Sequence, residues 1–151
     1  MNGFRLRLLI ITLLLTLPYS VQANFSGNWQ GDGWARFGNQ NVNCLNFNYR
    51  FVHKQGLLEI YESGYACENG FSRRWKRNNV DIVDGKLYLR GQRIGKITDN
   101  HFYAFFDFGE AQMRIEYNLF LFDENLYYIE TWKELDTGNV NFEIYSEMKA
   151  Q

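Results

Sequence analysis

The chain has 151 residues, of which 16 are lysine or arginine, 17 are aspartate or glutamate and two are cysteine. This length predicts one domain, alone or with a targeting segment. A hydrophobic content of 46% and an aromatic content of 18% exclude a disordered chain. The net charge of −1 excludes the strong basic field of a typical nucleic-acid-binding protein. Two cysteines are too few for a structural zinc site, and the two histidines add little.

The first 23 residues have the pattern of a secretory signal peptide. Arg5 and Arg7 precede an apolar run over residues 8–17, and Ala23 supplies a small residue before the cleavage point. The alternative is a membrane anchor, but the run is shorter than the ~20 residues that span a bilayer. We expect cleavage after Ala23 and a soluble, exported domain over residues 24–151, either periplasmic or secreted. That domain has 14 basic and 17 acidic residues, a net charge of −3.

The rest of the chain alternates between polar and apolar residues and is divided by glycine, asparagine and aspartate pairs. No segment shows a sustained helical period. Because the turns are closely spaced, we expect an all-β fold: an antiparallel up-and-down meander that closes into a barrel of about 8–10 strands, which hides its edges. The expected strands span residues 28–37, 43–54, 57–67, 71–77, 80–83, 86–90, 93–98, 101–108, 111–122, 126–135 and 140–149, with some neighbours open to merging.

The two cysteines provide a test of strand register. If Gln55-Gly56 forms a two-residue turn, Lys54 pairs with Leu57 and Cys44 lies directly opposite Cys67. Export makes a disulfide available, so we predict a Cys44–Cys67 bridge, the alternative being two buried thiols. The same register predicts an interior face of Leu45, Phe47, Tyr49, Phe51 and His53 opposite Ala66, Gly64, Glu62, Ile60 and Leu58. It places both cysteines on the other face with Asn46, Asn48, Arg50, Glu59 and Tyr61.

A second hairpin extends the predicted interior face. Taking Asn69-Gly70 as its turn brings Trp75 opposite Gly64 and Arg77 opposite Glu62. Charged groups do not enter a dry core without compensation, so two explanations stay open. One is a structural ion pair near the barrel rim, and the other is a wet cavity where arginine holds an anionic or polar ligand group. The candidate ligand-binding residues are Tyr49, Glu62, Arg73, Trp75 and Arg77.

The later strands supply bulky apolar side chains. A turn at Gly109-Glu110 predicts that Phe102, Ala104, Phe106 and Phe108 point inward. The turn at 123–125 leaves two choices: one places Tyr128, Glu130 and Trp132 inside, and the other Tyr127, Ile129 and Thr131. So many aromatic residues could fill the barrel, since barrels near eight strands hold either a packed core or one small ligand.

A short motif at the start of the exported domain resembles a known signature. Gly27-x-Trp29-x-Gly31-x-Gly33 is similar to the first strand of the lipocalin and wider calycin barrels, and to the opening of nitrobindin-type barrels. The resemblance implies a small, mostly apolar ligand in the barrel cup. Trp29 is expected to close one barrel end, so it has a structural role, as Cys44 and Cys67 do through their predicted bridge. The haem-ligating histidine of nitrobindins has no counterpart after His101, so no cofactor is expected.

Enzyme functions find little support. His53 and His101 are 48 residues apart and are predicted on opposite faces, and no nucleophile, metal or phosphate-binding motif is present. We therefore expect neither catalytic residues nor a metal site.

A second function class follows from the charge distribution. Residues 24–100 carry 11 basic and 7 acidic groups, a net charge of +4, whereas residues 101–151 carry 3 basic and 10 acidic groups, a net charge of −7. The run 73–77 could attract an anionic envelope lipid, a polysaccharide or an acidic protein. The alternative function is therefore a filled barrel that acts on an envelope partner or as an inhibitor through its surface. A ligand-binding cup predicts a cavity of at least ~300 Å³. A filled barrel predicts none, and loss of binding when Arg74 or Lys76 is reversed.

Overall fold

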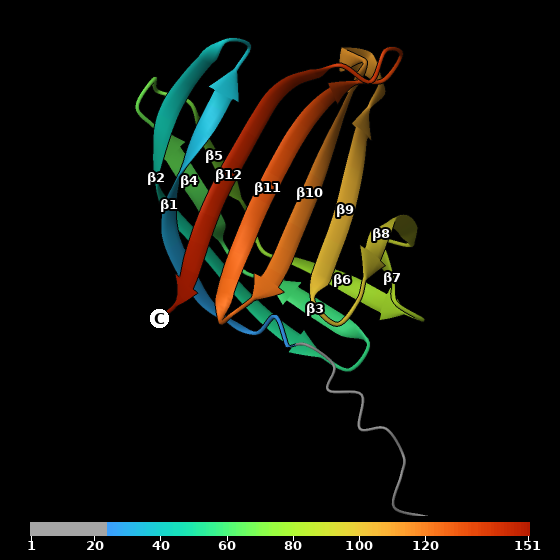
Figure 1. Ribbon diagram of the computed structural model, residues 1–151. Coiled ribbons are helices and arrows are strands. Elements are labelled where there is room, and N and C mark those ends of the chain that lie inside the picture. The colour runs from blue at the N-terminus through green and yellow to red at the C-terminus, as the bar shows by residue number, and fades with distance from the viewer. Residues whose placement is uncertain (1–23) are drawn as a thin grey trace, which may run out of the picture.

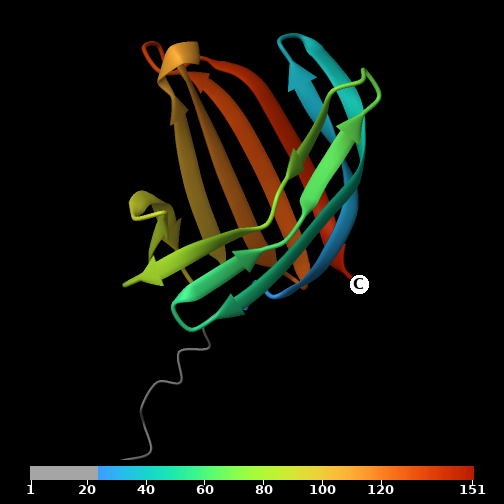
Figure 2. The ribbon, with the colours of Figure 1, turned by 180° about the vertical axis from the view of Figure 1, so that it is seen from behind.

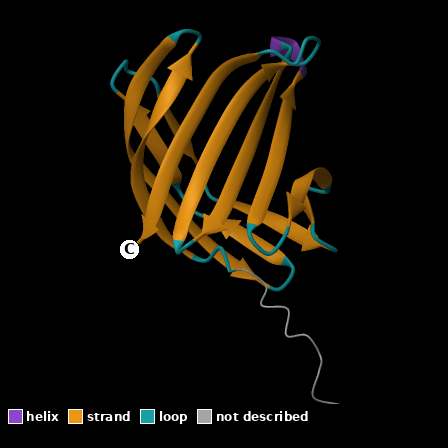
Figure 3. Ribbon diagram, in the orientation of Figure 1, coloured by secondary structure: helices purple, strands orange, loops and turns teal. Residues whose placement is uncertain are grey.

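The computed structural model describes residues 24–151, so the predicted signal peptide lies outside the described residues. Within this range twelve strands form one antiparallel sheet, and one short 3-10 helix, Gly109–Ala111, joins two of them (Figure 1, Figure 3). The strands are β1 (Gly27–Phe37), β2 (Gln40–Lys54), β3 (Leu57–Ile60), β4 (Ser63–Cys67), β5 (Ser72–Trp75), β6 (Asn78–Val83), β7 (Lys86–Leu89), β8 (Gln92–Ile97), β9 (His101–Phe108), β10 (Met113–Phe122), β11 (Asn125–Glu134) and β12 (Val140–Ala150).

The sheet closes on itself because β1 pairs with both β2 and β12. One half of the long strand β2 pairs with β3 and the other half with β4. β6 then pairs with β3 and β5 with β4, so β3/β4 and β5/β6 are two interrupted strands. Counted this way, the described chain is a ten-stranded meander barrel, and the expected all-β class is confirmed.

Two β-bulges interrupt the pairing of β2 with β3 and β4. Leu45 pairs with Ala66 but Asn48 pairs with Gly64, so β2 contains one extra residue at Asn46, whose φ is +58°. Between the pairs Phe51–Ile60 and Asn48–Gly64, the partner strand contains one extra residue around 61–63. A bulge sets two residues against one and turns the following side chains to the other face. The wall from β2 to β6 is therefore irregular (Figure 2).

The two bulges cancel at the cysteines. Cys44 lies opposite Cys67 and the two form a disulfide, so the predicted bridge is confirmed. The predicted interior positions of Phe47, Tyr49 and Phe51 are confirmed, but the predicted faces are wrong beyond each bulge, at residues 44–45 and 62–67, because each extra residue reverses the alternation. Both cysteines are buried instead of facing outward, and Leu45 is 43% exposed. Glu62, Gly64 and Ala66 lie on the outer face, while Ser63 and Tyr65 are buried.

The wall from β9 to β12 has long strands with an almost continuous register. Phe102 and Ala104 are buried as expected. Of the two choices for β11, the structure adopts the one with Tyr128, Glu130 and Trp132 inside, since Tyr128 and Glu130 are buried and the Trp132 indole reaches Glu130.

The glycine motif brings β1 close to β12. A Cβ atom on Gly31 would lie 2.1 Å from the Glu147 carbonyl oxygen, and one on Gly33 would lie 1.9 Å from that of Tyr145. Glycine at these positions is thus required for barrel closure. Trp29 is buried nearby, and its indole N–H donates to the Phe25 carbonyl at 3.1 Å.

Candidate functional site

A buried carboxyl group, Glu130 of β11, is the centre of the barrel's polar interior. The Tyr65 and Tyr128 hydroxyls donate to its Oε2 at 3.0 and 2.6 Å, and the Trp132 indole N–H donates to its Oε1 at 2.7 Å. Arg73 places its Nε 3.7 Å from the same Oε1. All these neighbours are donors, which is the arrangement that stabilises a carboxylate away from water.

Arg73 of β5 links this centre to the barrel opening. Its side chain is 23% exposed, and its Nη2 donates to the Tyr117 hydroxyl at 2.9 Å. Its Cζ lies 5.1 Å from the ring centre of Trp75 and 4.9 Å from that of Trp132, distances that permit cation–π attraction. Burial lowers the pKa of Arg73, but Tyr117 and Glu130 outweigh this, so its pKa shifts upward.

The surrounding tyrosines are held in their neutral form. Burial raises the pKa of Tyr49, Tyr65, Tyr117 and Tyr128 above the ordinary tyrosine value, and the charge of Glu130 adds to each shift. They therefore stay hydrogen-bond donors at neutral pH.

A small apolar cavity lies beside this polar centre. Its volume is about 90 Å³, well below the ~300 Å³ that a ligand-binding cup predicts. Two of its wall residues have buried hydroxyls: that of Ser63 has no hydrogen-bond partner, and that of Tyr49, close to Tyr128, has none of standard geometry. The interior is thus largely filled, with two polar atoms left on the wall of the remaining space.

Three of the five candidate ligand-binding residues meet inside the barrel. The Tyr49 and Trp75 rings lie 5.8 Å apart, and Arg73 stacks on Trp75. Glu62 and Arg77 do not join them, and the predicted interior placement of both is wrong. β5 pairs Trp75 with Ser63 rather than Gly64, because the turn before it has three residues, 68–70, instead of two.

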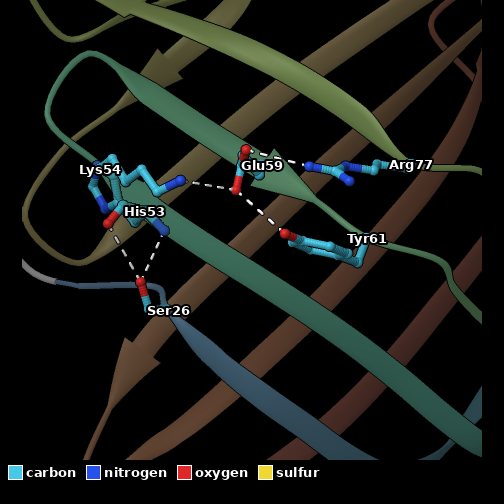
Figure 4. A network of polar contacts seen from close by, with 6 residues as sticks. All are labelled: Ser26, His53, Lys54, Glu59, Tyr61 and Arg77. Atoms are coloured by element: carbon cyan, nitrogen blue, oxygen red, sulfur yellow. Dashed lines mark hydrogen bonds and ion pairs between the residues drawn. The ribbon is translucent and has the colours of Figure 1, made fainter.

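Arg77 instead belongs to an outer polar cluster with Glu59 (Figure 4). The Glu59 carboxylate receives hydrogen bonds from Lys54 at 3.2 Å, Arg77 at 3.4 Å and the Tyr61 hydroxyl at 3.4 Å. The Lys54 hydrogen bond is the main cause of the lowered pKa of Glu59. Arg50 and Arg77 each stack on the Tyr61 ring with Cζ 4.6 Å from its centre. This cluster keeps two guanidinium groups together on the barrel surface.

Two larger depressions lie on the outer face, where β2 bulges away from its neighbours. One has a volume of about 520 Å³ and the other about 390 Å³, and they share Asn46 and Asn48. Together we call them the outer groove. It crosses β1, β2, β4 and β5 with the residues Gln30, Gly31, Asp32, Asn46, Phe47, Asn48, Glu62, Ser63, Gly64, Tyr65, Ala66, Ser72 and Arg74.

Sequence reasoning missed the central position of Glu130 and the inward direction of Tyr65. Glu130 was one of two open choices, because a turn at 123–125 can be drawn in two registers. A bulge-free alternation that points Glu62, Gly64 and Ala66 inward leaves no inward position for Tyr65. One signal was available: Cys44 and Phe47 are both apolar and three residues apart, which breaks the alternation.

Residues 24–151 contain neither a cluster of metal-ligating side chains nor a helix that could cross a membrane. No three His, Cys, Asp or Glu side chains there gather closely enough to hold a metal ion. The same residues contain no helix of the length and apolar character that a membrane crossing requires.

No protein-family profile matches the sequence, and no curated protein matches it significantly.

Proposed function

We propose that the protein is an exported, filled β-barrel that binds a polar component of the cell envelope through its outer groove, as a binding protein rather than an enzyme. One observation carries this proposal. The larger depressions, about 520 and 390 Å³, are on the outer face, whereas the interior cavity is about 90 Å³. A groove of this size is in the range of ligand sites, and the interior cavity is below it.

The charges support the same conclusion. Inside the barrel, Arg73 is compensated by Glu130 and is bonded to Tyr117, so its charge has a partner within the fold. Arg74, the next residue, points outward and lies on the wall of the outer groove. Because side chains alternate along β5, Arg73 stabilises the interior while Arg74 is available to a partner on the outer face.

Two features support export. A disulfide such as Cys44–Cys67 persists in oxidising compartments and is rare in the cytosol. The N-terminal 23 residues have the charge and apolar pattern of a signal peptide.

A sedimentation assay tests the proposal. Purified, disulfide-bonded protein is mixed with washed envelopes of the source cell and centrifuged. Ala66→Trp fills the outer groove at an exposed position, and Ala150→Trp is the matched control, an exposed strand alanine elsewhere. We expect the wild type and Ala150→Trp to sediment with the envelopes and Ala66→Trp to stay in solution. Sedimentation of Ala66→Trp at the wild-type level, or no sedimentation of the wild type, would contradict the proposal.

A second candidate function is the binding of a small apolar ligand inside the barrel. The Ser63 and Tyr49 hydroxyls on the cavity wall favour it, since buried polar groups normally have a partner. The resemblance to calycin barrels points the same way. Native mass spectrometry of the protein purified from its own compartment tests it. A discrete extra mass that is lost on denaturation and absent in Ser63→Ala would support this candidate; a bare mass with the two-hydrogen disulfide deficit would reject it.

A further inference from the structure

The outer groove has a chemical character that narrows its partner. We propose that it binds an acidic glycan, a chain of sugar rings that carries carboxylate, phosphate or sulfate groups. This inference rests on the proposed function and identifies the class of partner. It follows from the amides that line the groove, from its small-residue floor and from the cations at one end.

The amide side chains of the groove suit sugar hydroxyls. Gln30, Asn46 and Asn48 each offer both donors and acceptors, which pair with adjacent hydroxyl groups on a ring. Asp32 accepts the Asn46 backbone N–H at 3.0 Å, which fixes the bulge that forms this part of the groove. Glu62 lies on the opposite side and is an acceptor for hydroxyl protons.

The floor of the groove is formed by small residues. Gly64 and Ala66 lie on the outer face of β4, where larger side chains would fill the depression. The groove crosses four strands, and three strand spacings of about 4.8 Å give it a length of about 14 Å. Such an extended, shallow shape suits several linked rings better than a single small ion.

Positive charge gathers at one end. Arg74 lies over Gly64 on the groove wall, and its Cγ would be 3.2 Å from a Cβ at that glycine. Arg50 follows Asn48 on the same face of β2, and Arg77 joins it on the Tyr61 ring. Arg74 is the one basic residue of the groove lining, which also contains the carboxylates of Asp32 and Glu62. On the surface beside this end, within 50–77, the outward basic side chains outnumber the acidic ones, which favours an anionic partner there. The basic set is Arg50, Lys54, Arg74, Lys76 and Arg77, and the acidic set is Glu59, Glu62 and Glu68.

The same lining disfavours a protein or a lipid surface. Protein interfaces depend on buried aromatic and apolar anchors, and membrane surfaces need apolar side chains to insert. The two aromatic residues of the groove, Phe47 and Tyr65, turn their rings inward, where they stack on each other at 4.6 Å. Only their backbones therefore reach the groove.

Calorimetric titration of the disulfide-bonded protein tests the inference. The probes are oligogalacturonate, a heparin-derived oligosaccharide, fully methyl-esterified oligogalacturonate and a polyglutamate of matched length. We expect at least one anionic glycan to bind, and both the neutral ester and polyglutamate to bind about tenfold more weakly. Arg74→Glu should lower the affinity by about tenfold, the scale of a lost charged hydrogen bond. The exposed Arg93→Glu serves as the matched control and should leave the affinity within about twofold, because rim charges far from a site matter little.

The outcomes separate the two proposals. If neither anionic glycan binds but envelope sedimentation still depends on Ala66, the glycan inference fails and the proposed function stands. If sedimentation also fails to depend on Ala66, both fail. Equal affinity for polyglutamate and glycan would show that charge alone is recognised and would overturn the inference. Loss of glycan affinity in Asn48→Leu, an exposed groove position that carries no charge, would support the sugar-binding role of the amides.

Discussion

The two walls of the barrel, β9 to β12 and β2 to β6, differ in the regularity of their strands and in their charge. β9 to β12 run as long strands with an almost continuous register, and this half of the chain carries a net charge of −7. The wall from β2 to β6 is broken into short segments by bulges. Its outward basic residues are Arg50, Lys54, Arg74, Lys76 and Arg77. Regular strands pack the core, whereas the irregular ones create the outer groove.

The walls meet at Glu130. This residue comes from the regular wall, and its partners Tyr65 and Arg73 come from β4 and β5 of the irregular wall. Since neither β4 nor β5 is long, the buried carboxyl group connects the weakest part of the barrel to its strongest. We therefore expect variants at this junction to have the largest effect on stability.

The largest effect is expected for Glu130→Ala. It leaves the Arg73 guanidinium and three hydrogen-bond donors without their buried acceptor, so we expect a loss of about 3–5 kcal/mol in the free energy of unfolding. Glu143→Ala, which removes an exposed ion pair with Arg36, is the matched control on β12 and should cost less than about 1 kcal/mol. Urea denaturation measures both. Equal losses in the two variants would mean that Glu130 does not join the walls.

The disulfide should rank second. Replacing both Cys44 and Cys67 with alanine is expected to cost about 2–4 kcal/mol, because the bridge restricts the unfolded chain. The effect should be unequal across the molecule: amide hydrogen exchange should quicken in β4 and β5 more than in β10 and β11. An equal increase in exchange rate along the whole chain would contradict the view that the disulfide stabilises the irregular wall more than the regular one.

The third-largest effect is expected from alkaline pH, which should lower the free energy of unfolding through Tyr65. The pKa of Tyr65 is raised in the folded state, so the unfolded tyrosine ionises first as the pH passes about 10. The folded state then holds more protons than the unfolded state, and stability falls with rising pH. In Tyr65→Phe the free energy of unfolding should fall less steeply with pH, by up to about 1.4 kcal/mol per pH unit. The same pH slope in the variant and the wild type would show that Tyr65 does not contribute.

The smallest effect is expected at the β2 bulge. Asn46 has a φ of +58°, which β-branched residues avoid. Asn46→Val should therefore destabilise the protein by about 1–2 kcal/mol, and Asn46→Gly should change it little. Thermal unfolding of the two variants measures the difference. Should valine be tolerated as well as glycine, the bulge would not depend on this conformation.

The regular wall was largely predictable from the sequence, and the irregular wall was not. The strand spans, the meander and the inward direction of Phe102 and Ala104 followed from alternation and turn residues. The Cys44–Cys67 pairing was also found, because the two bulges between the cysteines and the β2–β3 turn cancel. Counting residues from the β2–β3 turn therefore gives the correct partner for Cys44, even though the pairs predicted between the two bulges are shifted by one residue.

The candidate site was predicted only in part. Tyr49, Arg73 and Trp75 meet inside, but Glu62 and Arg77 face outward because an extra residue lies on each of their strands. For Arg77 the break is between β5 and β6, where two residues, 76 and 77, separate the inward-facing Trp75 from Asn78, which also lines the cavity. A one-residue change in alternation reverses every following side chain, and asparagine at position 46 is one of the residue types that tolerate the necessary φ.

The most direct test of the account compares the inside and the outside of the barrel in one assay. Ala66→Trp fills the outer groove, and Ala104→Leu fills the interior cavity, which Ala104 lines. Both variants are tested for sedimentation with the same envelope preparation. The account predicts that Ala104→Leu binds like the wild type and Ala66→Trp does not bind. Loss of binding in Ala104→Leu with retention in Ala66→Trp would contradict it and would indicate that the interior cavity is the binding site.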